Sequence, residues 1–468
     1  MKIGFIHYHL KTGGVTTVLK RQIMAIRGAC DALVMTGDRA AAQLPCKVVE
    51  IPELGYDHPG IAKPPPDRIV EQVLKVLRER WPGGCDVLHV HNPTLAKNRK
   101  FLPIIKKLQQ AGVNLFLQIH DFAEDGRPDA YVEDEYPADC HYGVINLRDR
   151  DILLKAGLSG AGLHHIPNAV EGLSVKRGRC AKPQILYPVR AIRRKNLGEA
   201  ILLSMFFKDG RRLAVTQPPN SPADVTAYRD WVDWVRKHRL RVDFEVGMHT
   251  DFPILVGSSE SIVTTSISEG FGLTYLEPWT AGKPLWGRRL ADICSDFETN
   301  GIHLKPFYDR LDVPLAWIDA EGFSRKWHAA VVDAARRYGH PVAADAATRA
   351  FARMTHADKV DFGLLSEKFQ RQVLARLMTD PSAKAELGSL NPRLSHPGGA
   401  AGSSAIIESN RQAVLRHYGT EPYSERLLEI YGRIVEHPVG HRIDKAALCD
   451  AFFNLDRFSL LQWSPYGG

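Results

Sequence analysis

The chain has 468 residues, of which 44% are hydrophobic and 24% charged, the profile of a globular protein with two or three domains. No apolar run approaches the ~18–20 residues that cross a bilayer, and the segment Met1–His7 becomes polar too early for a secretory signal. We therefore expect a cytoplasmic protein. Peripheral contact with a membrane is an open alternative, although no segment of the sequence supports it.

The seven cysteines are scattered without a C-x-x-C pair, which indicates neither a zinc site nor a disulfide framework. The net charge of +8 fits an anionic substrate or surface, and no aromatic-interleaved basic pattern indicates nucleic acid.

Short apolar runs alternate with helical patterns in roughly the first 175 residues, the signature of a parallel sheet with helical crossovers. The run 3–8 is followed by Gly13-Gly14 and by a helical pattern from Val15. Further strands are expected at 87–90, 115–119 and 142–145, with a helix from about 67 to 77.

The alternation restarts near residue 180, after a polar linker at 171–182. Strands are expected at 184–189, 212–215, 242–246 and 261–265, and helices at 197–207, at 225–237 and from about 273. From about 364 the sequence is helical, apart from the small-residue loop 397–404. The last segment carries aromatic and aliphatic residues that are too apolar to be left in solvent, namely Phe452, Phe453, Phe458, Leu460, Leu461 and Trp463.

The strongest motif is Ser268-Glu269-Gly270-Phe271-Gly272-Leu273, which follows a predicted strand and opens a predicted helix. Its glycines permit a tight turn with outward-pointing N–H groups, and the helix N-terminus adds partial positive charge, so we expect a diphosphate there. Glu269 lies in the turn and Glu277 just past the first helical turn, where both can face one cleft and bind sugar hydroxyls. The alternative is an acidic helix start that stabilises only its own dipole.

A second motif is the basic segment Arg190–Lys195. Arg190 ends a predicted strand, where ligands of open parallel sheets bind, and Lys195 begins the following helix. Two cations there can neutralise the diphosphate that leaves when a bond between a sugar and a nucleotide breaks. The alternative is a solvated basic loop, and we expect Arg193 and Arg194 to be surface charges of that kind.

Three weaker motifs lie in the first 175 residues. Gly13-Gly14 turns a strand into a helix but lacks a full G-x-G-x-x-G fingerprint, so a purely structural turn stays open. His120 lies at the carboxyl end of a strand, which favours a cleft, although a lone histidine is more often structural. The segment 149–151 has the D-x-D form of a metal–nucleotide motif but opens a helix, where acids favour the dipole, so we expect no metal site there.

Taken together, the motifs resemble those of retaining glycosyltransferases of the two-domain GT-B fold, family four (the group 1 type). Glu269 and Glu277 match the E-x7-E motif of that family, and Arg190 and Lys195 match its paired diphosphate-binding cations.

The resemblance extends to the first half of the chain. Gly13-Gly14-Val15 matches the N-terminal glycine loop of the family, and His120-Asp121 matches its strand-end histidine motif. The segment 167–170 resembles the Pro-Asn-Gly segment before the interdomain linker, with Ala169 in place of the usual glycine. The match covers about residues 1–290, in the family's order.

The resemblance implies an α/β protein of the GT-B fold, with two doubly wound Rossmann-like domains that face a cleft and a helical C-terminal extension. Residues 1–175 would form the acceptor-binding domain and 176–363 the domain that binds the nucleotide sugar. Residues 364–468 would be the helical extension that crosses back to the N-terminal domain.

Site roles follow from the same resemblance. Arg190 and Lys195 would stabilise the diphosphate, Glu269 would contact hydroxyls of the donor sugar, and His120 would lie near the reacting sugar. The implied donor-binding residues are Gly13, Gly14, Gly270, Phe271, Gly272, Leu273 and Glu277, the last on the ribose hydroxyls. Such enzymes need no metal and no further cofactor, and retention is ascribed to front-face attack assisted by the departing phosphate.

The expected activity is therefore the transfer of a hexose from a UDP-glucose or GDP-mannose type of donor to a hydroxyl of a small soluble or carbohydrate acceptor. A lipid-linked or polysaccharide acceptor is an alternative, as is a nucleotide-sugar epimerase or hydrolase of the same fold. A non-catalytic sugar-binding protein is the least favoured alternative, because all of the motif residues are present.

Overall fold

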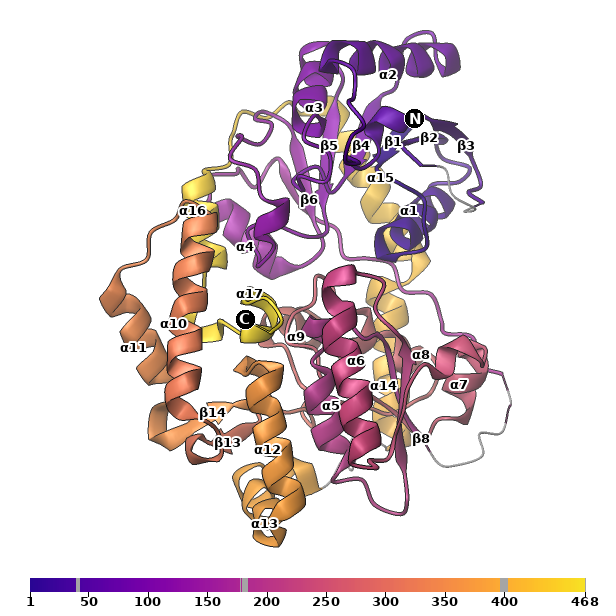
Figure 1. The fold of residues 1–468 in the computed structure, drawn as a ribbon. Helices are drawn as coiled ribbons and strands as arrows, with labels where there is room; N and C mark the ends of the chain where they lie inside the picture. Colours follow the sequence, from indigo (N-terminus) through magenta and orange to yellow (C-terminus); the bar gives the residue numbers. More distant parts are fainter. Residues whose placement is uncertain (39–42, 177, 179–183, 396–402, 468) are drawn as a thin grey trace. The chain divides into compact units, whose positions relative to one another are not determined.

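The computed structural model describes residues 1–38, 43–176, 178, 184–395 and 403–467. The chain divides into two compact units, both built from parallel strands and helices (Figure 1). Unit 1 comprises Met1–Ala169 and Tyr418–Phe453, and unit 2 comprises Val170–His417 and Asn454–Gly468. The chain therefore leaves unit 1, completes most of unit 2, returns to unit 1 and ends in unit 2. Most of the expected loop 397–404, and five of the twelve residues of the expected linker 171–182, lie outside the described residues.

Unit 1 is built on a parallel sheet of seven strands in the order β3-β2-β1-β4-β5-β6-β7. The strands are β1 (Lys2–His7), β2 (Asp31–Thr36), β3 (Lys47–Glu50), β4 (Val87–His91), β5 (Leu115–Ile119), β6 (His141–Val144) and β7 (Leu163–His165). The helices are α1 (Gly14–Ala25), α2 (Pro66–Arg80), α3 (Phe101–Gln110), α4 (Leu147–Lys155), α15 (Thr420–Glu436) and α16 (Lys445–Phe452). The strand order reverses between β1 and β4, and ligands of such sheets bind beyond the carboxyl ends of the strands at this reversal.

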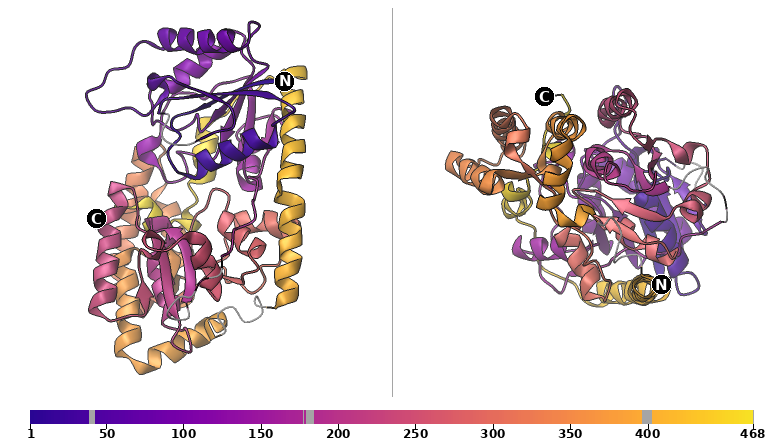
Figure 2. Two further views of the ribbon diagram at one scale, coloured as in Figure 1. Left: turned by 90° about the vertical axis from the view of Figure 1, so that its right-hand side faces the viewer. Right: turned by 90° about the horizontal axis from the view of Figure 1, so that it is seen from below.

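Alternate side chains of the unit 1 strands supply two hydrophobic cores, one on each face of the sheet. In β2, Val34 packs into the core with α1 and α15, whereas Leu33 and Met35 pack into the core with α2, α3 and α4. Figure 2 shows helices on both sides of these strands. Burial on both faces explains why the strands appear as continuous apolar runs in the sequence.

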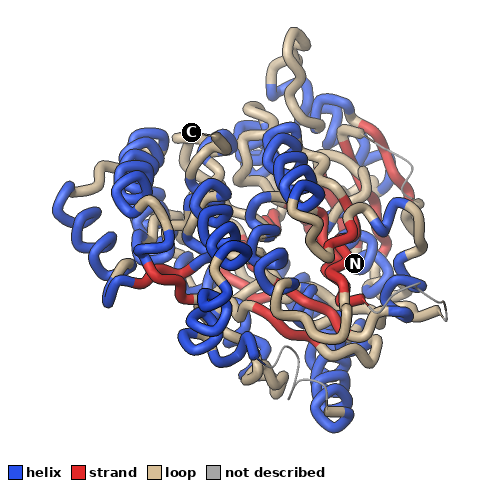
Figure 3. Tube along the Cα trace, turned by 60° about the horizontal axis from the view of Figure 1, so that its bottom comes forward, coloured by secondary structure: helices blue, strands red, loops and turns tan. Residues whose placement is uncertain are grey.

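Unit 2 has a parallel sheet of five strands in the order β10-β9-β8-β11-β12. Its strands are β8 (Gln184–Arg190), β9 (Arg212–Gln217), β10 (Val242–Asp243), β11 (Ser261–Thr264) and β12 (Leu285–Gly287), and helices surround them (Figure 3). The helices of its βα portion are α5 (Leu197–Ser204), α6 (Pro222–Lys237), α7 (Phe252–Ser258), α8 (Glu277–Thr280) and α9 (Ala291–Thr299). The strand expected at 242–246 is shorter than predicted, because Glu245 has a left-handed φ of 61° and a 3₁₀ turn begins at Val246.

The rest of unit 2 is mainly helical. The strands β13 (Asp312–Pro314) and β14 (Lys359–Asp361) form a small antiparallel pair. Between them in the chain lie two helices that were not predicted from the sequence, α10 (Ala320–Arg337) and α11 (Ala344–Met354). The expected helical C-terminal region is present as α12 (Glu367–Thr379), α13 (Pro381–Leu390), α14 (Ser404–Tyr418) and α17 (Leu460–Trp463), in addition to α15 and α16 of unit 1. Of the six apolar residues named near the C-terminus, five are buried as expected, Phe458 and Leu460 fully so, and Trp463 is partly buried. Among the described residues, no helix is both long and apolar enough to cross a membrane.

A buried ion cluster joins three distant segments of unit 2. The Arg288 guanidinium donates to the carboxylate of Glu199 at 2.9 and 2.7 Å and to that of Asp361 at 2.8 and 2.7 Å. All three side chains are at most 9% exposed, and the Tyr308 hydroxyl donates a further bond to Glu199. The single cation therefore compensates two buried carboxylates.

We predict that Arg288→Met strongly destabilises unit 2. The variant leaves Glu199 and Asp361 buried without their cation, and loss of one partner of a buried ion pair costs about 3–5 kcal/mol. Chemical denaturation followed by circular dichroism measures the change. The matched control is Arg325→Met, which removes an exposed pair with Glu321 and is expected to leave the midpoint unchanged. Equal midpoints for both variants would show that the cluster contributes nothing.

Candidate active site

Two loops at the carboxyl edge of the unit 2 sheet carry most of the predicted donor site. Strand β8 ends at Arg190 and leads into a 3₁₀ turn, η3 (Arg193–Lys195), before α5 begins. Strand β11, which pairs in parallel with β8, ends at Thr264 and leads into the loop 265–272. Because parallel neighbours end at the same edge of a sheet, the two loops leave it next to each other.

Hydrogen bonds fix these two loops to one another. The Thr265 hydroxyl lies 3.1 Å from the carbonyl oxygens of both Lys195 and Asn196. The backbone N–H of Ile267 donates to the carbonyl of Arg194 at 3.0 Å. The turn η3 is therefore held against the loop 265–272. The predicted helix start at Lys195 is instead the last residue of this turn, and α5 begins two residues later, after Asn196 in a left-handed conformation.

Lys195 and Arg194 both form ion pairs with the carboxylate of Glu269. The Lys195 ammonium donates a short hydrogen bond to Oε1, and Arg194 Nη1 lies 3.2 Å from Oε2. Arg194 also donates to the carbonyl of Ser268 at 2.7 Å. The expectation that Arg194 is a solvated surface charge is therefore wrong, since its partner lies 75 residues away in the sequence and only the fold brings the two together.

The charge state of this cluster follows from its surroundings. Burial alone raises the pKa of Glu269, but Lys195 and Arg194 outweigh burial and lower that pKa to about 2. Burial lowers the pKa of the Lys195 ammonium, and the charge of Glu269 partly offsets this. Glu269 is therefore a carboxylate at neutral pH, and two cations against one anion leave a net positive charge that suits an anionic ligand.

Arg190 lies at the same edge but has a different partner. Its guanidinium donates to the side-chain oxygen of Gln217, at the end of the neighbouring strand β9, at 3.3 Å. The structure thus brings Lys195 and Glu269 together, whereas Arg190, at the end of β8, contacts the end of β9. Both predicted cations belong to β8 and the turn after it, but Lys195 faces the loop after β11 and Arg190 faces β9.

The glycine loop after β11 has the tight turn that the sequence predicts. Gly272 has a φ of +89°, and a Cβ there would lie 2.9 Å from the ring of Tyr275, so only glycine fits. Phe271 is buried and packs edge-on against Phe297, with 5.6 Å between the ring centroids. These contacts give the loop one defined shape.

The helix expected from Leu273 differs from the prediction. Leu273–Tyr275 is a 3₁₀ turn, and the short helix α8 begins only at Glu277. Pro278 explains the break, because the residue before a proline disfavours helical geometry and the proline has no N–H to donate. Such short pieces carry little macrodipole, so recognition of an anion at this edge depends on the cations more than on a helix N-terminus.

In unit 1, Gly13 and Gly14 open helix α1. Gly13 has an extended φ of 178° and is the N-cap, and both glycines are exposed. A Cβ on Gly14 would meet no atom within 4 Å, so neither packing nor a left-handed φ requires glycine there. Because neither glycine has a side chain, the N-terminus of α1, in the segment after β1, is open to solvent.

His120 follows strand β5 and is nearly fully buried. Its backbone N–H donates to Asn92 Oδ1 at 2.7 Å, and its Nε2 lies 2.9 Å from Nδ1 of His91, at the end of β4. The two imidazole rings stack, with 5.2 Å between their centroids. Sequence reasoning missed His91, although the alternation His89-Val90-His91 at the end of a buried strand is an unusual pattern that marks it.

The histidine pair belongs to a larger buried cluster, and burial keeps that cluster uncharged. His89 stacks on His91 at 4.5 Å, and its ring nitrogens contact the Tyr431 hydroxyl and Gln118 Oε1, both at 2.9 Å. Burial lowers the pKa of His89 to about 3 and that of His120 to about 4. At neutral pH these rings are neutral hydrogen-bonding groups and not anion-binding cations.

Asp149, in the D-x-D segment, is part of a helix start as expected. It lies in the first turn of α4, and its backbone N–H donates to Oδ1 of the N-cap residue Asn146 at 2.7 Å. Within the described part of the chain, no group of three or more histidine, cysteine or acidic side chains is arranged to hold a metal ion.

Comparison with known proteins finds glycosyltransferases that are similar to this chain in sequence or fold. A mannosylglucosyl-3-phosphoglycerate synthase from Petrotoga mobilis is 26% identical over 350 residues, which span 66% of this chain and 68% of that protein. Among solved structures, HepE from Anabaena in complex with UDP-glucose aligns with a TM-score of 0.54 at 14% identity, over 92% of this chain and 98% of that one. A sucrose-phosphate synthase from Thermosynechococcus elongatus gives a TM-score of 0.52 at 14% identity, over 92% and 98% of the two chains. No protein-family model matches the chain.

The chain has the GT-B glycosyltransferase fold. This confirms the fold predicted from the motifs, including the helical C-terminal region. The sequence relative is named as a glycosyl-transferring synthase, and HepE is a structural neighbour that binds UDP-glucose. The assignment to family four, the E-x7-E motif and the roles of the individual site residues stay predictions.

We predict that unit 1 loses stability as the pH falls below about 6.5. Between that value and pH 4, the unfolded chain binds a proton at His89 and at His120 that the folded unit does not bind. Each such histidine costs about 1.4 kcal/mol of unfolding free energy per pH unit in this window. The substitution His89→Gln should reduce the slope by that amount. The reporter is ¹⁹F NMR of 5-fluorotryptophan at Trp81 during urea titration; equal slopes for both proteins would contradict the assignment.

Proposed function

We propose that this protein is a retaining hexosyltransferase that moves a hexose from a nucleotide-diphospho-sugar, of the UDP-glucose or GDP-mannose type, to a hydroxyl of a small polar or carbohydrate acceptor. The observation that carries the proposal is the ion cluster of Lys195, Arg194 and Glu269 at the carboxyl edge of the unit 2 sheet, in a chain with the GT-B fold. It combines cations for a leaving diphosphate with a carboxylate for sugar hydroxyls.

The leaving diphosphate would be stabilised by charges that are already in place. Lys195, Arg194 and Arg190 would lie around its oxygens, and Gly270–Gly272 would offer backbone N–H groups from a rigid loop. Fixed cations stabilise the charge that develops on the leaving group without reorganising. In enzymes that use a divalent metal, the metal compensates this developing charge. Here the fixed cations would compensate it, which supports transfer without a metal.

Glu269 suits binding better than covalent catalysis. Each of its carboxylate oxygens already faces a cation, and its pKa of about 2 keeps it from acting as a general acid at neutral pH. An oxygen engaged in this way is a poor nucleophile but accepts hydrogen bonds from sugar hydroxyls. This supports retention by front-face attack assisted by the departing phosphate, with Glu277 on the ribose hydroxyls.

The acceptor would be bound by unit 1. There, Gly13 and Gly14 would approach the donor phosphates or sugar, and His120, held by His91, would lie near the reacting sugar as a neutral hydrogen-bonding group. Because the relative from Petrotoga mobilis is named for a product that joins sugars to 3-phosphoglycerate, a glycosylated phosphoglycerate is the first acceptor class to test. The net charge of +8 agrees with an anionic acceptor.

A panel of UDP- and GDP-hexoses tests this proposal, with release of the nucleotide measured with and without acceptors. The acceptors are glucosyl-3-phosphoglycerate, glucosylglycerate, an oligosaccharide and a polyprenyl phosphate. We expect release that depends on acceptor, persists in excess EDTA and gives an α-linked product by proton NMR. Release without acceptor would indicate an epimerase or hydrolase, and turnover with the polyprenyl phosphate alone would move the acceptor to lipid. A β-linked product would rule out retention.

We predict that Lys195→Met lowers turnover by about 10²–10³-fold while the fold is kept, because one preorganised charge is removed from a developing anion. Turnover is measured with the donor that the panel identifies, and circular dichroism checks the fold. The control is Lys237→Met, an exposed lysine at the end of α6. Near-wild-type turnover of folded Lys195→Met would remove Lys195 from the reaction.

A further inference from the structure

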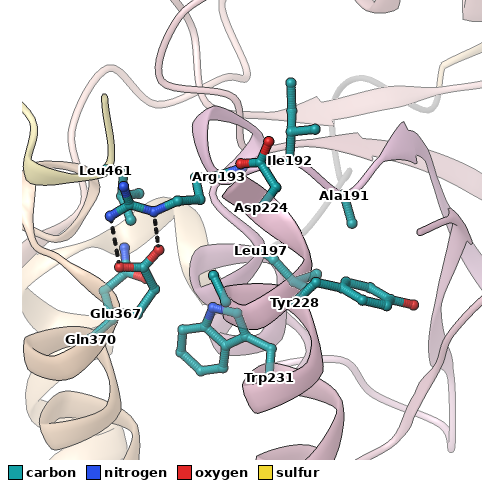
Figure 4. A pocket seen from close by; sticks show the side chains of 11 residues that line it. Ala191, Ile192, Arg193, Leu197, Asp224, Tyr228, Trp231, Glu367, Gln370 and Leu461 are labelled. Atoms are coloured by element: carbon teal, nitrogen blue, oxygen red, sulfur yellow. Dashed lines mark hydrogen bonds and ion pairs between the residues drawn. The ribbon is translucent and has the colours of Figure 1, made fainter. Parts of the chain in front are cut away.

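A small pocket lies on unit 2 beside the turn that carries Lys195 (Figure 4). It is lined by residues from the β8–α5 connection, from α6, from α12 and from the C-terminal helix α17. None of the predicted site residues lines it. The residue that links the pocket to the predicted donor site is Arg193, whose neighbours Arg194 and Lys195 contact Glu269.

Arg193 is engaged on every side of its guanidinium group. Its Nε and Nη2 donate to the two carboxylate oxygens of Glu367, in α12, at 2.6 and 3.0 Å (Figure 4, dashed lines). Nη1 donates a short bond to the carbonyl of Ser464, and Nη2 lies 3.2 Å from the carbonyl of Leu460. The side chain is 11% exposed and that of Glu367 4%, so the expectation that Arg193 is a surface charge is wrong.

The same turn is held from two further directions, once through its backbone and once through a side chain. The Arg193 N–H donates to Asp224 Oδ1, in α6, at 3.0 Å. Gln370 Nε2, one helical turn after Glu367, donates to Asn196 Oδ1 at 2.8 Å. Packing there is tight, because a Cβ on Gly198 would lie 2.2 Å from Gln370 Oε1.

The C-terminal segment that supplies two of these acceptors is itself anchored in unit 2. The Trp327 indole N–H donates to the carbonyl of Phe458 at 3.1 Å, and the Ser459 hydroxyl donates to that of Gly363 at 2.7 Å. Leu460 is fully buried. The carbonyls that face Arg193 therefore belong to a fixed piece of structure.

We propose that Arg193 is a positioning residue for the donor site: through Glu367 and the segment 454–467 it sets the shape of the turn 193–196 and so the direction of Arg194 and Lys195 toward Glu269. This rests on the proposed function, in which those two cations hold the donor diphosphate. A 3₁₀ turn of three residues has weak internal hydrogen bonds, so outside contacts decide its conformation. A bidentate, buried guanidinium–carboxylate pair fixes orientation as well as distance.

Hydrogen exchange of the intact protein tests the proposal without any substrate. In Arg193→Met, amides in the peptide 190–200 should exchange about tenfold faster or more, with little change elsewhere. Arg353→Met is the matched control, because Arg353 ties the same C-terminal segment through an exposed pair with Asp456 at 2.7 Å and does not contact the turn. Exchange in 190–200 that is unchanged in Arg193→Met, or equally raised in Arg353→Met, would overturn the proposal.

Kinetics separate a positioning role from a loss of folded protein. Destabilisation alone lowers the apparent kcat and leaves both KM values unchanged. A misplaced pair of cations should raise the donor KM, lower kcat/KM for the donor by about 10²-fold and leave the acceptor KM unchanged. Unchanged KM values for both substrates would therefore overturn the proposal, whereas faster exchange in a protein with no transferase activity would leave the positioning contact in place and reject the proposed function.

Two further variants keep the test decisive. Should Arg193→Met fail to fold, the isosteric Glu367→Gln can replace it, because it removes the charge of the partner. We expect the same faster exchange in 190–200 and the same rise in donor KM, both by smaller amounts. The double variant should show no more exchange than Arg193→Met alone, because the two residues act as one unit. Additive effects in the double variant would mean that Glu367 stabilises α12 independently of the turn.

Discussion

Burial of the Glu269 carboxylate is the constraint on which the proposed donor site depends. A buried carboxylate is tolerated only when cations and hydrogen bonds compensate it, and here Lys195 and Arg194 do so. The same two cations would be required by a leaving diphosphate. The ion cluster thus keeps positive charge at one edge of the sheet before any ligand binds. The carboxylate offsets the repulsion between the two cations in the absence of a ligand.

Unit 2 contains three such arginine–carboxylate clusters, which differ in how deeply they are buried. Arg194 lies at the sheet edge against Glu269, Arg193 lies behind it against Glu367, and Arg288 lies in the interior between Glu199 and Asp361. Asn196 connects the last two, because it accepts from Gln370 and donates to Glu199. Each arginine joins segments that are far apart in sequence, so the turn after β8 is positioned by the whole unit and not by its own short sequence.

The sequence was informative where structure is local. The strands β8 and β11 and the tight turn at Gly272 follow from short patterns, and the meeting of Lys195 with Glu269 follows from the ends of adjacent parallel strands. The fates of Arg193 and Arg194 could not be predicted in this way. Their partners lie 174 and 75 residues away, and a basic run looks the same whether it is solvated or buried.

Two other differences between prediction and structure come from single residues whose chemistry a search for apolar periodicity does not weigh. The helix expected from Leu273 is broken before α8 because Pro278 cannot donate a hydrogen bond back into the preceding turn, a constraint that the apolar periodicity does not show. The pattern His89-Val90-His91 marks His91 as unusual, but the role of His91 comes from the ring of His120, which only the fold brings beside it. Both cases show that periodicity predicts the element, whereas the chemistry of single side chains decides how the element ends and what it contacts.

The order in which the chain is made gives the contact between Arg193 and Ser464 a further consequence. The two residues are 271 positions apart, so at a synthesis rate of about 5–20 residues per second the arginine waits roughly 15–50 s for its acceptor. The sheet of unit 2 can form during that interval, because its five strands end at Gly287. The turn beside it cannot reach its final shape until the segment 454–467 has been made and has packed. Folding of unit 2 is thus divided into an early step that builds the sheet and a late step that aligns the cations.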